Sequence, residues 1–213
     1  MQGSFIVIEG PDGAGTTTHS RLLAERLEQS GKKILRTSEP SDGPIGLSIR
    51  EYLHGGNRLP PSALQLLFSA DRAWHVETVI EPALREGTTV ICDRYIASTI
   101  VYGALQGISK EWLQNLNSKY IQPDCQLLLL PSVDICMARL QKRAKSDIFE
   151  TRAQQEKIHG EYRAWATENP AVQVIDSGTM KEDVAAEIHH MLCLSMEKPA
   201  EKKKDCNEPA SAA

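Results

Sequence analysis

A glycine-rich turn near the start of the chain carries residue types suited to binding phosphate. It separates the apolar run Phe5-Ile-Val-Ile from a stretch, residues 17–30, in which leucines recur at helical spacing. Backbone N–H groups of such a turn can point at an anion, and the N-terminus of the following helix adds partial positive charge. We therefore predict that the turn is a P-loop that holds the phosphate chain of a nucleotide. The predicted phosphate-binding residues are Gly10, Asp12, Gly13, Ala14, Gly15, Thr16, Thr17 and Thr18.

The turn departs from the usual P-loop at one position. Thr16 stands where a P-loop ordinarily has lysine, so a neutral hydroxyl replaces a full positive charge beside the phosphates. Thr17 is in register with the hydroxyl that ligates Mg²⁺ in P-loop proteins. A glycine-rich turn without a ligand is the alternative. The strand before the turn, the helix after it and the position of Thr17 all favour phosphate binding.

A second chemical signal follows another apolar run. Asp93 and Arg94 come directly after residues 88–92, at what would be the carboxyl end of a strand, where ligands bind in open parallel sheets. A guanidinium there can bind a phosphate through two hydrogen bonds, and a carboxylate can hold Mg²⁺ through water. The alternative for Arg94 is a structural ion pair with Asp93. Its location favours the phosphate.

Short apolar runs alternate with helical stretches along the chain. The predicted strands are 5–8, 33–38, 88–92, 125–130 and 172–176, and the predicted helices are 17–30, 45–53, 60–85, 96–105, 110–120, 133–143, 151–167 and 181–196. Pro82 lies within the pattern of 60–85 and should kink or divide that helix. This alternation predicts an α/β fold, a five-stranded parallel sheet flanked by helices on both faces. We expect one domain over 1–196 and a disordered polar tail over 197–213.

Several segments together resemble the thymidylate kinases, P-loop nucleoside monophosphate kinases. They are 5–15, Glu39-Pro40, 67–72, 80–84 and 90–95 with Ser98 and Tyr102-Gly103 following, and the resemblance covers about residues 5–180. It implies phosphoryl transfer from ATP to dTMP with Mg²⁺, giving ADP and dTDP for dTTP synthesis. It also implies a P-loop NTPase-type fold with a short lid, and a homodimer packed through helices.

The resemblance also implies roles for individual residues. Phe68 and Arg72 share a helix face, so that Phe68 can stack on the pyrimidine while Arg72 donates to a base carbonyl. Tyr102 would lie beside the deoxyribose and disfavour a ribose 2′-hydroxyl. Asp12 resembles the carboxylate that orients the acceptor nucleotide. The implied dTMP-binding set is Asp12, Glu39, Phe68, Arg72, Arg94, Ser98 and Tyr102, with Glu39 on the acceptor or the magnesium side. The implied metal residues are Thr17 and Asp93.

A charged stretch after the fourth strand is the best source of the positive charge that Thr16 lacks. Arg139, Arg143 and Lys145 lie where the family has a mobile lid, expected here at about 143–151. With Gly13 after Asp12, the chain resembles the version of the family that places its basic residues in the lid. We expect Asp12, Arg94, Arg143 and Lys145 to be catalytic and Arg139 to bind ATP. A solvated helix end is the alternative.

Composition bounds the remaining possibilities. The formal net charge of −4 gives no global basic field for nucleic acid, and no apolar run is long enough to cross a membrane. The start of the chain shows no signal-peptide pattern, and the five cysteines are scattered, without metal-ligand spacing. We therefore expect a cytoplasmic enzyme that binds neither nucleic acid nor membrane.

Two other functions are consistent with parts of the sequence. A catalytically weak or silent homologue could bind dTMP and nucleotides yet fail to turn over because the P-loop lysine is missing. A deoxynucleoside kinase would phosphorylate a sugar hydroxyl. Retention of Arg94 argues against the second alternative, because a nucleoside has no phosphate to bind.

Overall fold

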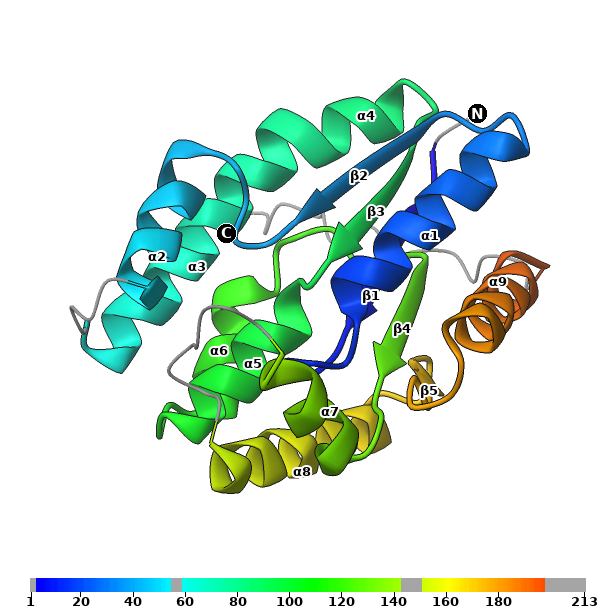
Figure 1. Ribbon diagram of the computed structural model, residues 1–213. Coiled ribbons are helices and arrows are strands. Elements are labelled where there is room, and N and C mark those ends of the chain that lie inside the picture. The colour runs from blue at the N-terminus through cyan, green and yellow to red at the C-terminus, as the bar shows by residue number, and fades with distance from the viewer. Residues whose placement is uncertain (1–2, 55–58, 143–150, 198–213) are drawn as a thin grey trace, which may run out of the picture.

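The computed structural model describes residues 3–54, 59–142 and 151–197, and Figure 1 shows a central sheet wrapped by helices. The sheet has five strands in the order β2-β3-β1-β4-β5, and every neighbouring pair is parallel. The strands are β1 (Phe5–Glu9), β2 (Ile34–Ser38), β3 (Thr89–Asp93), β4 (Cys125–Leu129) and β5 (Gln173–Ile175). The predicted five-stranded parallel α/β fold is confirmed.

The helices lie close to their predicted positions, and all but α9, which follows β5, lie between successive strands of the chain. They are α1 (Thr16–Gln29), α2 (Pro44–His54), α3 (Pro61–His75), η1 (Val76–Ile80), α4 (Glu81–Arg85), α5 (Ile96–Leu105), α6 (Lys110–Asn117), α7 (Val133–Leu140), α8 (Arg152–Glu168) and α9 (Lys181–Glu197). Among the described residues, no helix combines the length and apolar character needed to span a membrane.

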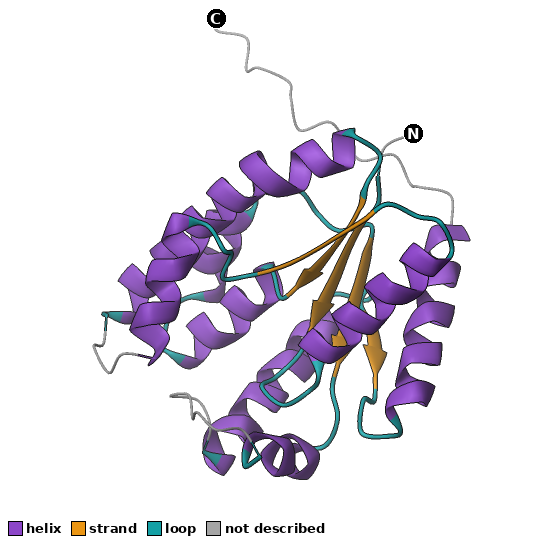
Figure 2. Ribbon diagram, turned by 45° about the horizontal axis from the view of Figure 1, so that its top comes forward, coloured by secondary structure: helices purple, strands orange, loops and turns teal. Residues whose placement is uncertain are grey.

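Alternating side chains of β1 belong to two buried clusters, and Figure 2 shows helices on both sides of the sheet. Ile6 and Ile8 pack toward α1 and α9 in one buried cluster. Phe5 and Val7 pack toward η1, α4 and Tyr95 in another. Because successive strand residues point to opposite faces, Glu9 follows Phe5 and Val7 toward the second layer, where a carboxylate needs partners.

The long helix predicted over 60–85 is interrupted, as the position of Pro82 led us to expect. The interruption is a π-helical turn at Val76–Ile80, and Pro82 then lies in the first turn of α4. Proline lacks an N–H, and its ring clashes with the carbonyl four residues earlier in a regular α-helix, so the wider π turn that precedes Pro82 accommodates it. The turn begins directly after His75, the last residue of α3.

Three strand ends bring polar residues to one edge of the sheet. β1 ends at Glu9, β2 at Ser38 and β3 at Asp93, and these strands are adjacent and parallel. Glu39 donates its backbone N–H to the carbonyl of Asp93 at 3.0 Å, and Arg94 donates to the carbonyl of Ile8 at 2.9 Å. The residues that follow the three strands are therefore held side by side, at the edge where parallel sheets bind ligands.

Candidate nucleotide-binding site

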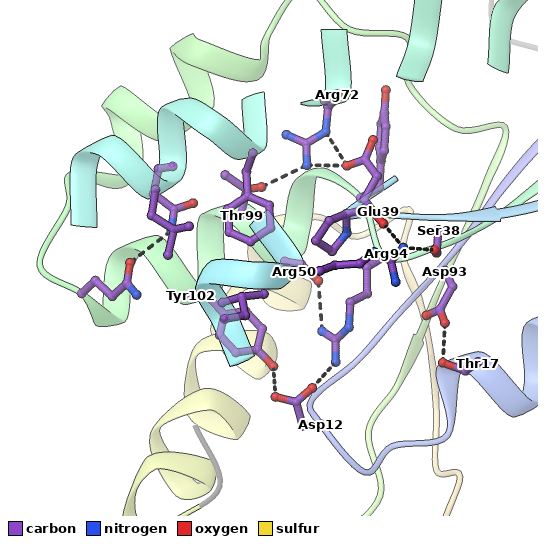
Figure 3. Close-up of a pocket in the computed structure, with 18 of the residues that line it drawn as sticks. Asp12, Thr17, Ser38, Glu39, Arg50, Arg72, Asp93, Arg94, Thr99 and Tyr102 are labelled. Carbon is purple, nitrogen blue, oxygen red and sulfur yellow. Dashed lines mark hydrogen bonds and ion pairs between the residues drawn. The ribbon is translucent and has the colours of Figure 1, made fainter. Parts of the chain in front are cut away.

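A cavity of about 330 Å³ opens at this edge of the sheet (Figure 3). It reaches from Asp12 and Thr17 of the predicted P-loop to the facing helices α3 and α5. Its lining residues are Asp12, Thr17, Arg36, Ser38, Glu39, Pro40, Arg50, Leu53, Leu64, Gln65, Phe68, Arg72, Asp93, Arg94, Tyr95, Ser98, Thr99, Tyr102 and Gln106. Every residue predicted to bind dTMP lines this cavity, as do both predicted metal residues.

Thr17 and Asp93 meet at the P-loop end of the cavity. The Thr17 hydroxyl donates to Asp93 Oδ2 at 2.6 Å. Asp93 Oδ1 is buried and has no hydrogen-bond partner among the described residues. A buried carboxylate oxygen without a partner is costly, and a hydroxyl beside a carboxylate is an oxygen-only donor set of the kind that Mg²⁺ prefers. These two residues therefore fit a magnesium ion.

Arg94 has a backbone conformation that residues other than glycine rarely adopt, with φ at 68°. Its guanidinium reaches Asp12 Oδ1 at 2.7 Å through Nη2, and Ser98 Oγ at 3.2 Å through Nη1. Asp93 is thus not its ion-pair partner. Strained backbone of this kind persists where the surrounding structure fixes it, and it is concentrated at functional sites. The side chain is held beside the P-loop with its planar donor group in the cavity.

Asp12 links the P-loop to α5. Its second oxygen accepts a hydrogen bond from the Tyr102 hydroxyl at 3.0 Å, and the Tyr102 ring lies 5.6 Å from the Arg94 guanidinium carbon. Burial and the neighbouring Asp12 carboxylate raise the pKa of Tyr102 well above its ordinary value of 10.0, so its hydroxyl stays a donor at neutral pH. Asp12, Arg94 and Tyr102 therefore form one connected group.

Glu9 lies beneath the site, is not among the residues that line the cavity, and was not predicted by our sequence analysis. It is fully buried and accepts hydrogen bonds from Tyr95 N at 2.8 Å and from Ser98 Oγ at 2.6 Å. Burial raises the pKa of Glu9, and the hydrogen bond from Ser98 opposes that shift. Because Ser98 also contacts Arg94, Glu9 anchors the start of α5 beneath that arginine. The sequence feature that could have indicated Glu9 is its position, as a glutamate at the end of an otherwise apolar strand.

Phe68 and Arg72 lie on the α3 wall of the cavity, as their spacing predicted. Arg72 is only 1% exposed. Its Nε donates to Glu39 Oε2 at 2.9 Å, its Nη2 donates to Thr99 Oγ1 at 3.0 Å, and its Nη1 donates to Asn117 Oδ1. Glu39 is therefore the buried ion-pair partner of Arg72, with Oε2 only 2.7 Å from Nη2. Sequence spacing predicted that Arg72 faces Phe68 but not its pairing with Glu39.

The P-loop itself has the backbone that its glycines allow. Gly13 and Gly15 have φ of 85° and 95°. A Cβ on Gly13 would lie 2.7 Å from the carbonyl oxygen of Cys136 in α7, so the loop packs too tightly there for another residue. Thr16 is buried in the first turn of α1, and its hydroxyl cannot supply the lost lysine charge.

Arg139 lies against the P-loop rather than in the cavity. Its Nη1 donates to the carbonyls of Gly13 and Ala14, each at 3.2 Å, and its Nη2 donates to the carbonyl of Ser177 at 2.8 Å. A cation therefore does stand at the loop. Arg143, Lys145 and the remainder of the predicted lid up to residue 150 lie outside the described residues.

Other cavity residues were missed by the sequence analysis. They are Arg36, Ser38, Pro40, Arg50, Leu53, Leu64, Gln65, Tyr95, Thr99 and Gln106. Gln65 and Thr99 could have been predicted from the sequence, because they lie one turn from Phe68 and from Tyr102 on helix faces already assigned to the site. Arg36 and Arg50 lie on an edge strand and on a separate helix, where nothing in the sequence shows which way they point.

The parallel sheet, the glycine-rich loop after β1 and the cavity at the carboxyl edge are consistent with the P-loop NTPase-type fold. Residues 8–188 match the family model described as thymidylate kinase. The chain is 38% identical to the probable thymidylate kinase of Pyrococcus horikoshii over 194 residues, which are 88% of this chain and 95% of that protein. It is 41% identical to the thymidylate kinase of Thermomicrobium roseum over 193 residues, 86% of this chain and 90% of that protein. The chain belongs to the thymidylate kinase family.

Proposed function

We propose that this protein transfers the γ-phosphoryl group of ATP to the phosphate of dTMP. The observation that carries the proposal is the continuity of the cavity, which runs from the Asp12 and Thr17 side chains of the P-loop to Phe68 and Arg72. Such a cavity can hold an acceptor nucleotide with its phosphate beside the donor's phosphates. Family membership supports the same substrates.

Arg94 is the residue that we assign to the acceptor phosphate. Its fork of donors can bind two phosphate oxygens, while Asp12 and Ser98 hold it in place. A phosphate oxygen of dTMP would attack the γ-phosphorus of ATP as the bond from that phosphorus to the β–γ bridging oxygen breaks, leaving ADP. Positioning and cations supply most of the catalysis in such a transfer.

Thr17 and Asp93 are the residues that we assign to magnesium. The hydroxyl and the carboxylate lie together at the start of α1, next to the loop that would hold the β- and γ-phosphates. When held there, Mg²⁺ would supply positive charge that offsets the negative charge of the transferring group. Arg139 steadies the loop, and Arg143 and Lys145 are our candidates for the cations that act in place of a lysine at position 16.

Phe68, Arg72 and Tyr102 are assigned to the nucleoside. Phe68 offers a ring for stacking on the pyrimidine, and the anchored guanidinium of Arg72 faces the same cavity and can donate to a base carbonyl. We assign Tyr102, which donates a hydrogen bond to Asp12, to the deoxyribose. Family membership also leads us to propose a cytoplasmic homodimer packed through helices, and sedimentation at micromolar concentration would reveal a monomer if the assembly is wrong.

An acceptor panel tests the proposed reaction. ADP release is measured with ATP, Mg²⁺ and one of dTMP, dUMP, dCMP or thymidine. We expect dTMP to give the highest catalytic efficiency. Thymidine as the better acceptor would indicate a deoxynucleoside kinase instead. Binding of dTMP without any ADP release would indicate a silent homologue.

A further inference from the structure

A buried histidine lies behind the base-binding wall of the cavity. His75 is the last residue of α3, is 1% exposed and does not line the cavity. It follows Arg72 by three residues and so lies on the same face of the helix. A buried polar ring at this place needs hydrogen-bond partners, and both of its nitrogens have one.

Both partners of His75 come from the end of one strand. Nδ1 lies 3.2 Å from Glu39 Oε1, and Nε2 lies 2.7 Å from Thr37 Oγ1. Thr37 and Glu39 are two residues apart, which places them on the same side of extended chain. The imidazole ring is therefore held at both ends by β2 and the residue that follows it.

Glu39 divides its two oxygens between His75 and Arg72. Oε1 faces the His75 ring, and Oε2 accepts from the Arg72 guanidinium at 2.9 Å. The plane of a carboxylate with both oxygens engaged is fixed. Without a partner on Oε1, the carboxylate could turn about its last torsion, and the direction in which it holds Arg72 would change.

We propose that His75 is a positioning residue, which fixes Glu39 so that the Arg72 guanidinium points at the acceptor base. The inference rests on the proposed function, since it assigns Arg72 to a base carbonyl. His75 is not among the residues that line the cavity, so it acts through the carboxylate of Glu39. The expected consequence is a loss of base selectivity rather than a loss of phosphoryl-transfer chemistry.

Three substitutions separate this role from simple packing. His75→Asn places an amide nitrogen where Nδ1 stands and keeps the contact to Glu39. His75→Gln places it near Nε2 and keeps the contact to Thr37 instead. His75→Phe fills the space and keeps neither. A packing role ranks the variants by how well they fill the site, whereas the positioning role requires that Asn, and not Gln, preserves selectivity.

The measurement is the ratio of catalytic efficiencies for dTMP and dCMP. Thymine presents a carbonyl where cytosine presents an amino group, so a well-aimed guanidinium favours dTMP. We expect His75→Phe and His75→Gln to lower the ratio by about tenfold, mainly by raising the KM for dTMP, with the KM for ATP unchanged. His75→Asn should stay within about threefold of the unsubstituted protein, since it retains the charge-assisted contact.

His159→Phe is the matched control, because His159 is another buried histidine, located on α8 and not among the residues that line the cavity. It should leave the ratio unchanged whatever it does to the melting temperature. Equal ratios in the Asn and Gln variants, or an unaltered ratio in His75→Phe, would overturn the positioning role.

The experiment also separates this inference from the proposed function. If the unsubstituted protein releases no ADP with any acceptor, the proposed reaction is wrong. The ratio of dissociation constants for dTMP and dCMP, measured by calorimetry on the same variants, then decides the role of His75. Failure of the unsubstituted protein to prefer dTMP in binding overturns the inference as well.

Discussion

Arg94 Nη2 lies 2.7 Å from Asp12 Oδ1, which joins the residue after β3 to the loop after β1. Both residues line the cavity, and in the reaction that we propose the two phosphates would approach each other beside this pair. The carboxylate holds the guanidinium close to the P-loop, and Tyr102 holds the carboxylate from α5. The residue that we assign to the acceptor phosphate is therefore tied to the predicted P-loop by direct contact.

Replacement of Arg94 by alanine should abolish useful activity with dTMP. The bound phosphate loses a charge-assisted, bidentate partner, which typically costs about 2–5 kcal/mol. The check is the catalytic efficiency with dTMP at saturating ATP. Arg94→Lys is the control. Its catalytic efficiency should lie between those of the unsubstituted protein and Arg94→Ala, because lysine keeps the charge without the planar fork. An unchanged efficiency in Arg94→Ala would remove the residue from the site.

The backbone at Arg94 leads to a separate prediction about stability. Its φ of 68° lies in the left-handed region, which is open to glycine and strained for residues with a Cβ. Arg94→Gly should therefore be more stable than Arg94→Ala by roughly 0.5–1 kcal/mol, after the greater freedom of glycine in the unfolded chain is subtracted. Urea denaturation of the two variants measures the difference, and an alanine variant of equal or greater stability contradicts it.

Glu9 should make stability depend on pH. Burial raises its pKa above the ordinary value of 4.5, so the folded protein holds this proton more tightly than the unfolded chain does. Its contribution to stability is complete below pH 4.5 and is lost as the pH rises through the raised folded pKa. Glu9→Gln cannot ionise, so its free energy of unfolding should fall less over that interval. Parallel curves for the two proteins would contradict the assignment.

Asp93 should control the requirement for magnesium. Its unpartnered oxygen and its contact with Thr17 fit a bound cation. Asp93→Asn removes the charge while keeping the shape. We expect the Mg²⁺ concentration for half-maximal activity to rise about 10–100-fold. Asp176→Asn, at an exposed aspartate that follows β5, is the control and should leave the requirement unchanged. The same requirement in both variants would remove Asp93 from the metal site.

The order of apolar runs was enough to predict the sheet, because the three central strands β1, β3 and β4 are buried and must be apolar where they are covered. The edge strands β2 and β5 are only partly buried, and their shorter apolar runs still stand out between helical stretches. It was also enough to place Asp93 and Arg94 at an edge that binds ligands. The pairing of Arg72 with Glu39 was not predictable in the same way. The two residues are 33 positions apart, and their contact depends on how α3 crosses the end of β2. The partners of Glu9 were not predictable for the same reason. Strand alternation indicates which face of the sheet its side chain lies on, but not which residues it contacts there.

The last prediction concerns the compensation for Thr16. Its side chain is buried in the first turn of α1, at the position where a P-loop ordinarily has lysine. If Arg143 and Lys145 supply the missing charge, Arg143→Ala or Lys145→Ala should lower turnover far more than dTMP affinity. Such cations act on the transferring phosphoryl group.

Thr16→Lys should then partly restore turnover to Arg143→Ala. In the protein without other changes, Thr16→Lys should raise turnover little or lower it where a lid side chain already fills the space. Because both changes act on one group, their effects on turnover should not be additive. Turnover of Arg143→Ala, Thr16→Lys and the double variant, each at saturating ATP and dTMP, measures the coupling directly. Strict additivity would mean that the two positions do not share this role. Unaltered turnover after removal of both Arg143 and Lys145 would mean that these cations do not act in the reaction, leaving Arg139 at the loop as the next residue to test.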